Sequence, residues 1–90
     1  MIVQIGDVNI SGYITSTYKF DNLEEVAEFL EYASGRWVES PDGGGDVLLD
    51  MPYAYVYDVE SLDKFNSLVY PYPDWIIEHD MVGNYEVRTA

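Results

Sequence analysis

Side chains that commonly carry out catalysis are scarce in this sequence of 90 residues. It contains a single histidine, His79, and no cysteine, which excludes thiol catalysis and disulfide pairing. No serine motif accompanies His79, and a lone imidazole is more typical of a structural or surface residue than of a general base. Glycines 43–45 lack the lysine and Ser/Thr that a phosphate-binding loop requires. We therefore expect no catalytic residue, no cofactor and no enzymatic activity.

Carboxylates are so abundant, 17 in all, that two of them close in sequence are no sign of a glycosidase site. One group is a candidate for a cation, because Asp42, Asp46 and Asp50 bracket glycines 43–45 and Ca²⁺ prefers carboxylate and carbonyl oxygens. The spacing of an EF-hand is absent. We interpret residues 41–46 as a solvated loop and predict no metal site, with weak adventitious metal binding as the alternative.

The balance of charge is strongly acidic. Against 17 acidic residues stand only Lys19, Arg36, Lys64 and Arg88, which gives a formal net charge of −13. Such a chain repels nucleic acids and anionic membranes, and it associates faster with basic surfaces. The acidic residues are spread along the chain and aromatic residues are common, so we expect a folded domain and not a disordered one.

The densest acidic pattern falls on a predicted helix. Glu24, Glu28 and Glu31 follow the spacing i, i+4 and i+7, with Glu25 beside them, and no lysine relieves their repulsion. At the rise of an α-helix the three carboxylates cover about 10 Å. Their spacing of roughly 3.5 Å is close to the ~3.4 Å between phosphates along one DNA strand. This pattern predicts an anionic binding face, and an ordinary solvated helix face is the alternative.

Tyrosine is also over-represented, with nine residues. Tyr53, Tyr55 and Tyr57 are two apart, so on a strand they form one row, while Ala54 and Val56 face inward. Tyrosine is enriched in binding surfaces, which makes this row a candidate interface; a place in the core or at its rim is the alternative. A second acidic cluster opens the predicted second helix: Asp58, Glu60 and Asp63.

The elements that must position these residues begin with strands. Polar and apolar residues alternate over residues 8–20, which predicts a half-buried strand. Residues 2–5 are expected to form a short partner strand with a turn at Gly6-Asp7, unless residues 2–20 form one long, bent strand. Asp21 followed by Glu24 is typical of a helix N-terminus, and Gly35 of a C-terminus, so we predict a helix over residues 22–33.

The rest of the chain is expected to alternate between strands and one further helix. We predict strands at 36–39, 47–51 and 53–57 (the last two broken at Pro52), a helix at 58–69, and strands at 75–79 and 85–88 joined by a turn at Gly83-Asn84. A helix over residues 74–82 is the alternative to the strand at 75–79. The apolar positions of the second helix are Leu62, Phe65, Leu68 and Val69.

These elements predict a single α+β domain over residues 1–90, with one sheet of four to five mostly antiparallel strands and two helices. The chain has two similar halves, each with a strand, a helix and a tryptophan-bearing segment. This similarity fits a split βαβ, ferredoxin-like sheet with both helices on one face. The residues expected to share one core are Leu23, Val26, Leu30, Trp37, Phe65, Leu68 and Trp75.

Acidity and tyrosine on a small, lysine-poor domain predict an inhibitor that occupies a basic, nucleic-acid-binding site on a partner protein, as a DNA or RNA mimic. In size and composition the chain resembles small phage-encoded anti-restriction and anti-CRISPR proteins as a class, a likeness that carries over no residue. Alternatives are an acidic adaptor or antitoxin-like partner of a basic protein, a halophile domain, or an enzyme with a cryptic carboxylate site. We expect no direct contact with nucleic acid or membranes. The sequence has no signal peptide and no apolar run of ~20 residues, which predicts a cytoplasmic protein.

Overall fold

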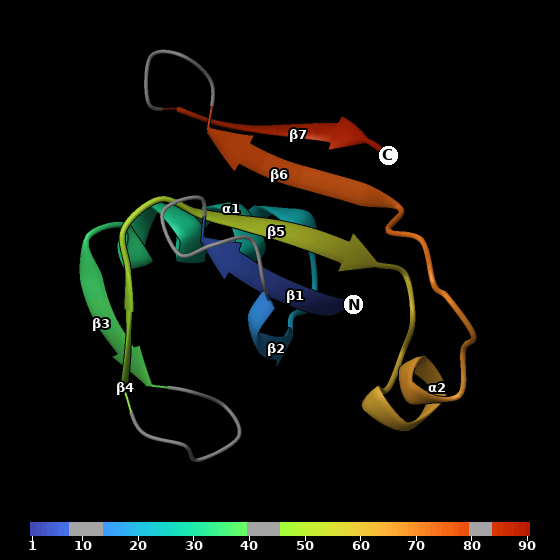
Figure 1. Ribbon diagram of the computed structural model, residues 1–90. Coiled ribbons are helices and arrows are strands. Elements are labelled where there is room, and N and C mark those ends of the chain that lie inside the picture. Colours follow the sequence, from blue (N-terminus) through green and yellow to red (C-terminus); the bar gives the residue numbers. More distant parts are fainter. Residues whose placement is uncertain (8–13, 40–45, 80–83) are drawn as a thin grey trace.

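The computed structural model describes residues 1–7, 14–39, 46–79 and 84–90, whose arrangement is drawn in Figure 1. Five strands form an antiparallel sheet in the order β2-β1-β5-β6-β7, and β3 and β4 form a separate two-stranded sheet. The α+β class and the antiparallel sheet are thereby confirmed, but the second sheet departs from the single sheet expected. The described elements are β1 (Ile2–Asp7), β2 (Ile14–Lys19), α1 (Leu23–Ala33), β3 (Arg36–Glu39), β4 (Asp46–Leu49), β5 (Pro52–Tyr57), α2 (Leu62–Asn66), β6 (Trp75–His79) and β7 (Tyr85–Thr89).

Strand β1 lies between β2 and β5 and pairs antiparallel with both. The predicted turn at Gly6-Asp7 is wrong, because Gly6 pairs with Tyr53 and Asp7 pairs with Pro52 inside the sheet. The register between β1 and β2 shifts at this point, next to Gly6, so the backbone irregularity that glycine signals is a bulge and not a turn. Residues 8–13 of the predicted alternating strand lie outside the described residues.

Helix α1 forms where the sequence predicted it, with a small change at its start. The N-cap is Asn22, one residue after Asp21, and its side chain accepts a hydrogen bond of 2.9 Å from the N–H of Glu25. At the other end Gly35 has φ of +73°, the left-handed conformation that favours glycine. One side of the helix is buried, through Val26, Leu30 and Ala33.

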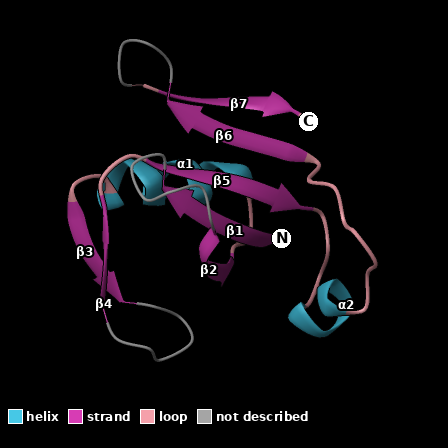
Figure 2. Cartoon of the chain, viewed as in Figure 1, coloured by secondary structure: helices cyan, strands magenta, loops and turns pink. Residues whose placement is uncertain are grey.

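The predicted strand–helix–strand unit over β2, α1 and β3 does not form within one sheet, because β3 pairs with β4 in the separate sheet and the crossover through α1 ends at β5 instead. Strands β2 and β5 are both antiparallel to β1, so they run parallel to each other with β1 between them. Helix α2 does not make a second such crossover, because β5 and β6 are antiparallel neighbours. A ferredoxin-like arrangement is therefore not confirmed. In Figure 2, α1 lies behind β1 and β5, whereas α2 lies beyond the end of β5.

Helix α2 is much shorter than the predicted residues 58–69. Ser61 caps its start by accepting a hydrogen bond from the N–H of Lys64, and the helix has five residues. Of the four predicted apolar positions only Phe65 is buried, and the exposed ones are Leu62, Leu68 and Val69. Leu68 and Val69, which follow the helix, are exposed, so no apolar packing supports a longer helix.

The apolar interior is divided between the two faces of the five-stranded sheet, which corrects the expected single core. The main core lies between α1 and the sheet and includes Val3, Ile5, Val26, Leu30, Val56 and Ile77; Leu23 and Trp75 are partly buried against it. Phe65 belongs instead to a smaller cluster with Ile2 and Tyr57. Two members of the expected core are exposed, Trp37 (66%) and Leu68 (45%).

The C-terminal strands β6 and β7 pair antiparallel from Trp75 opposite Thr89 to His79 opposite Tyr85. Both predicted strands are thus confirmed, and the alternative helix over residues 74–82 is wrong for residues 75–79. The predicted turn at Gly83-Asn84 falls partly outside the described residues, as does most of the predicted loop at 41–46. The predicted break at Pro52 is a change of sheet, because β4 pairs with β3 whereas β5 joins the main sheet.

Candidate partner-binding surfaces

The exposed side of α1 carries the four glutamates that the sequence predicted as an anionic face. Each of Glu24, Glu25, Glu28 and Glu31 is exposed, whereas Val26 and Leu30 point into the core. No lysine or arginine occurs within the helix. The first basic residue after it, Arg36, places its guanidinium 5.1 Å from the centre of the Tyr32 ring. The helix thus presents a row of carboxylates without a basic residue among them, which we call the acidic face.

The two ends of the acidic face differ in how they affect the stability of the helix. Glu24 and Glu25 lie in the first turn, where carboxylates interact favourably with the helix dipole. The Glu25 carboxylate also accepts a long hydrogen bond of 3.4 Å from the N–H of Asp21. Glu28 and Glu31 lie further on, toward the negative end of the dipole, and no basic residue occupies the last turn. Stability accounts for the first two residues but not for Glu28 and Glu31.

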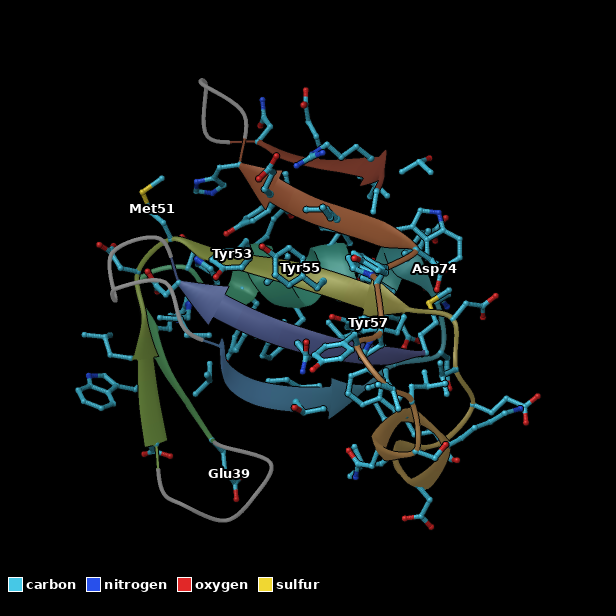
Figure 3. The ribbon with its side chains drawn as sticks, turned by 45° about the vertical axis from the view of Figure 1, so that its right-hand side comes forward. Glu39, Met51, Tyr53, Tyr55, Tyr57 and Asp74 are labelled. Carbon is cyan, nitrogen blue, oxygen red and sulfur yellow. The ribbon has the colours of Figure 1, made fainter. Side chains whose placement is uncertain are left out.

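The predicted tyrosine row lies on the opposite face of the sheet. Along β5, Ala54 and Val56 are buried in the main core, and Tyr53, Tyr55 and Tyr57 alternate with them on the other side. Figure 3 shows the three rings along β5, with α1 behind the strand. The alternation predicted from the sequence is confirmed.

The three tyrosines are not equally accessible. Tyr57 is 5% exposed, packs its ring against Phe65 at 4.7 Å between centroids, and donates a hydrogen bond of 2.9 Å to Oε1 of Gln4. Tyr53 and Tyr55 are half-buried, with their rings 5.3 Å apart. Burial raises the pKa of both Tyr53 and Tyr57 above the usual value, which favours the neutral phenol. Tyr57 is thus a core residue, and Tyr53 and Tyr55 are left as the accessible pair.

The second acidic cluster lies beside this tyrosine row. Asp58, Glu60 and Asp63 are all exposed, and α2 packs on Tyr57 through Phe65. The N–H of Asp58 donates a hydrogen bond of 2.7 Å to the carboxylate of Asp74, which fixes the start of the segment. Unlike the acidic face, this cluster contains a basic residue, because Lys64 directly follows Asp63 in α2.

The structure therefore divides the ten predicted partner-binding residues between two opposite sides of the molecule. The acidic face is on the outer side of α1, and the tyrosines and the α2 cluster are on the far side of the sheet. A partner that docks on one flat surface would contact one of these sets and not both. The sequence could not reveal this separation, because it follows from which face of the sheet each helix covers.

Of the residues considered for chemistry, the described part of the chain includes His79, Asp46 and Asp50. Within the described ranges, no group of three His, Asp or Glu side chains could hold a metal ion. Of the candidate loop carboxylates, Asp42 lies outside the described residues. His79 packs on the ring of Tyr85 at 4.3 Å between centroids, and its Nδ1 is buried without a hydrogen-bond partner among the described residues.

The sequence-based prediction missed two features, one at the end of β1 and one on the β3–β4 hairpin. Asp7 is fully buried at the end of β1 and accepts hydrogen bonds from the N–H of Asp50 at 2.6 Å and of Met51 at 3.4 Å. Trp37 and Leu48 are exposed as direct partners across the β3–β4 hairpin. The period of two in β3, which places Trp37 opposite in direction to Val38, was the available signal for the exposed tryptophan.

Comparison of the chain with known protein families, with curated proteins and with solved structures gave no significant match. Neither helix of the described residues has the length and apolar character needed to cross a bilayer. The surfaces described above are thus the basis for a functional assignment.

Proposed function

We propose that this protein is an acidic inhibitor that binds a basic, nucleic-acid-binding site on a partner protein through the acidic face of α1. The observation that supports it best is the pair Glu28 and Glu31, which extend the carboxylate row toward the negative end of the helix dipole with no basic residue in the last turn. Repulsion between like charges three or four residues apart, Glu24 with Glu28 and Glu28 with Glu31, costs a few tenths of a kcal/mol per pair. A basic partner site would offset that cost.

The physical mechanism is electrostatic occupation of a site that otherwise holds phosphates. A net charge of −13 accelerates the encounter with a basic surface, and the row on α1 gives the complex a defined contact. Glu24, Glu28 and Glu31 span about 10 Å along the helix, a charge spacing similar to that of one nucleic-acid strand. Binding of this kind weakens as salt rises, because exposed charges are screened over about 8–10 Å.

A competition experiment tests this proposal. Partners are captured on the immobilised protein at low salt and identified, and their affinity for nucleic acid is measured with and without this protein. We expect mutually exclusive binding. A partner that holds both at once with unchanged affinities would contradict the proposal.

A pair of matched charge reversals locates the contact. Glu28→Lys with Glu31→Lys, and Glu60→Lys with Asp63→Lys, each change the net charge from −13 to −9, since each reversal adds two charges. The first pair should lower the association rate at least about tenfold, and the second pair much less. Equal effects would show that only the total charge matters.

A second candidate function is an acidic adaptor that holds two partners. It is favoured by the separation of the acidic face from the half-buried Tyr53 and Tyr55 on the opposite face of the sheet. For an adaptor, changing Tyr53 and Tyr55 to alanine should release one partner while the other stays bound to α1. An inhibitor with one partner would show no second partner that the tyrosine variant releases.

A further inference from the structure

The outer face of the β3–β4 hairpin is an exposed apolar surface that the proposed function leaves without a role. Trp37 and Leu48 are directly opposed in the antiparallel register, with 66% and 42% of their surface exposed. Adjacent large apolar side chains that are exposed on the surface are a feature of protein-interaction sites. Tryptophan is also the residue type most enriched at the energetic centres of protein interfaces.

The hairpin is held firmly, so this face has a fixed position. Its inner side is buried in the main core through Val38 and Leu49. The N–H of Gly35 donates a hydrogen bond of 2.7 Å to the carbonyl of Leu49, and the hydroxyl of Ser34 donates one of 3.0 Å to the carbonyl of Asp50. A preorganised surface loses less conformational entropy when it binds, which increases its affinity.

Carboxylates border the apolar pair on the same face. Glu39 lies two residues after Trp37, Asp46 lies two residues before Leu48, and the two acids are opposed across the hairpin. Both are exposed, and Figure 3 shows Glu39 at the far end of the hairpin, away from the main sheet. The face thus consists of an apolar pair with a pair of negative charges next to it.

We infer that the outer face of the β3–β4 hairpin is an apolar anchor that docks on a protein surface whose apolar centre is bordered by lysine or arginine. This inference rests on the proposed function for the basic character of the partner. Charge complementarity selects this occupant, because Glu39 and Asp46 would repel a nucleic acid. Two copies joined through this face would bring four carboxylates together, which disfavours self-association.

A synthetic peptide supplies a defined probe. An amphipathic helical peptide of leucine and lysine presents an apolar stripe bordered by positive charge, and a control peptide has serine in place of every leucine. The measurements use a Trp75→Phe background, in which Trp37 is the sole tryptophan and reports directly on its surroundings. Circular dichroism and thermal melts verify that each variant is folded.

We expect the leucine–lysine peptide to bind at low salt and to shift the Trp37 emission to shorter wavelengths as water is excluded from the ring. In that background Leu48→Ala should weaken binding about tenfold or more. With Trp75 restored and a labelled peptide, Trp37→Ala should do the same. The matched control is Tyr72→Ala, which removes a side chain that is 87% exposed elsewhere on the surface and should leave the affinity unchanged.

Four results would overturn the inference. They are equal affinity for the serine–lysine peptide, unchanged affinity after Trp37→Ala or Leu48→Ala, an emission shift caused by single-stranded DNA, and self-association that Trp37→Ala abolishes. Failure of the proposed function is distinguished from failure of this inference by comparing the α1 and hairpin variants. If charge reversal at Glu28 and Glu31 abolishes binding to the captured partner but the hairpin variants do not, the anchor is wrong and the inhibitor stands. If the hairpin variants abolish binding to the partner but charge reversal at Glu28 and Glu31 does not, the apolar anchor is supported and electrostatic blockade through α1 is wrong.

Discussion

The two faces of the five-stranded sheet differ in how much of each is covered by a helix. On one face α1 runs for 11 residues and buries Val26, Leu30 and Ala33 against the central strands. On the other face α2 has five residues, and Phe65 is its buried contact with Ile2 and Tyr57. The first face forms the main core, and the second leaves Tyr53 and Tyr55 half-buried. A sheet covered in this uneven way keeps one face for stability and leaves part of the other accessible to partners.

Local sequence signals do not explain this difference. Both helices start with a capping side chain, Asn22 in α1 and Ser61 in α2, and each cap accepts a hydrogen bond from a backbone N–H three residues later. The two helices differ in what lies beneath them, because most helical stability in proteins comes from packing of an apolar side. The contrast between a well-supported α1 and a weakly supported α2 can be tested by substitutions that are matched in chemistry.

The largest expected effect is the loss of a buried leucine. Leu30→Ala should lower the free energy of unfolding by roughly 2–5 kcal/mol, because Leu30 is fully buried between α1 and the sheet. Leu68→Ala should change it by less than about 0.5 kcal/mol, because Leu68 is 45% exposed. Chemical denaturation of both variants measures the difference. Equal losses would show that the region after α2 is packed after all.

A smaller difference is expected at the two helix caps. Asn22→Ala should cost about 1 kcal/mol of global stability, the usual value for an N-cap that is part of the cooperative core. Ser61→Ala should have a smaller effect on global unfolding, because α2 can open locally while the main core stays folded. Amide hydrogen exchange distinguishes the two cases: Ser61→Ala should speed exchange within α2 and leave α1 protected. Faster exchange throughout the sheet in this variant would contradict local opening.

The smallest expected difference in stability is between one tyrosine on each face. Tyr85 donates a hydrogen bond of 2.9 Å to the backbone carbonyl of Pro52, and Tyr57 donates to the side chain of Gln4. Tyr85→Phe should cost about 1 kcal/mol. Tyr57→Phe should cost less, because Gln4 can turn to find another donor whereas the carbonyl of Pro52 is fixed.

Tyr85 also gives stability a dependence on high pH. Burial raises the pKa of Tyr85 from 10.0 to about 12; interaction with the Ser34 side chain lowers it, and Asp7 and Glu31 make smaller contributions that raise it. The folded state favours the neutral phenol, so the contribution of Tyr85 is complete below pH ~10 and is lost as pH rises through about 12. Tyr85→Phe should reduce the loss of stability over this range. An unchanged profile would show that Tyr53 and Tyr57, whose pKa values are also raised, account for it.

The parts of the fold that could be predicted from the sequence are those whose signals are local. Helix α1 has its cap, its apolar spacing and Gly35 within 14 residues of one another, and β5 shows its inner face through Ala54 and Val56. The errors have non-local causes. Gly6-Asp7 was interpreted as a turn, whereas Asp7 is buried inside the sheet, and its burial depends on N–H donors 43 and 44 residues away.

The candidate site was predictable as a list of residues but not as a surface. Exposure of the α1 glutamates followed from helical spacing, and the tyrosine row followed from the period of two. Which side of the molecule each set occupies depends on strand order, and strand order is set by pairings between distant segments. Trp37 was expected in the core because it follows a predicted helix, as Trp75 does in the second half of the chain. In β3 the smaller Val38 takes the inward position instead.

The central place of β1 has a consequence for how the chain is synthesised and refolded. β1 can pair early with β2, which lies nearby in sequence, but its other partner β5 begins only at Pro52. Until β5 is available, one edge of β1 is open beside the apolar side chains of Val3 and Ile5, and open edges of this kind promote aggregation. Repulsion between chains opposes that association, because residues 1–51, which precede β5, already contain ten acidic and two basic residues. The acidity that we assign to partner binding would then also protect the incomplete sheet while the chain emerges from the ribosome.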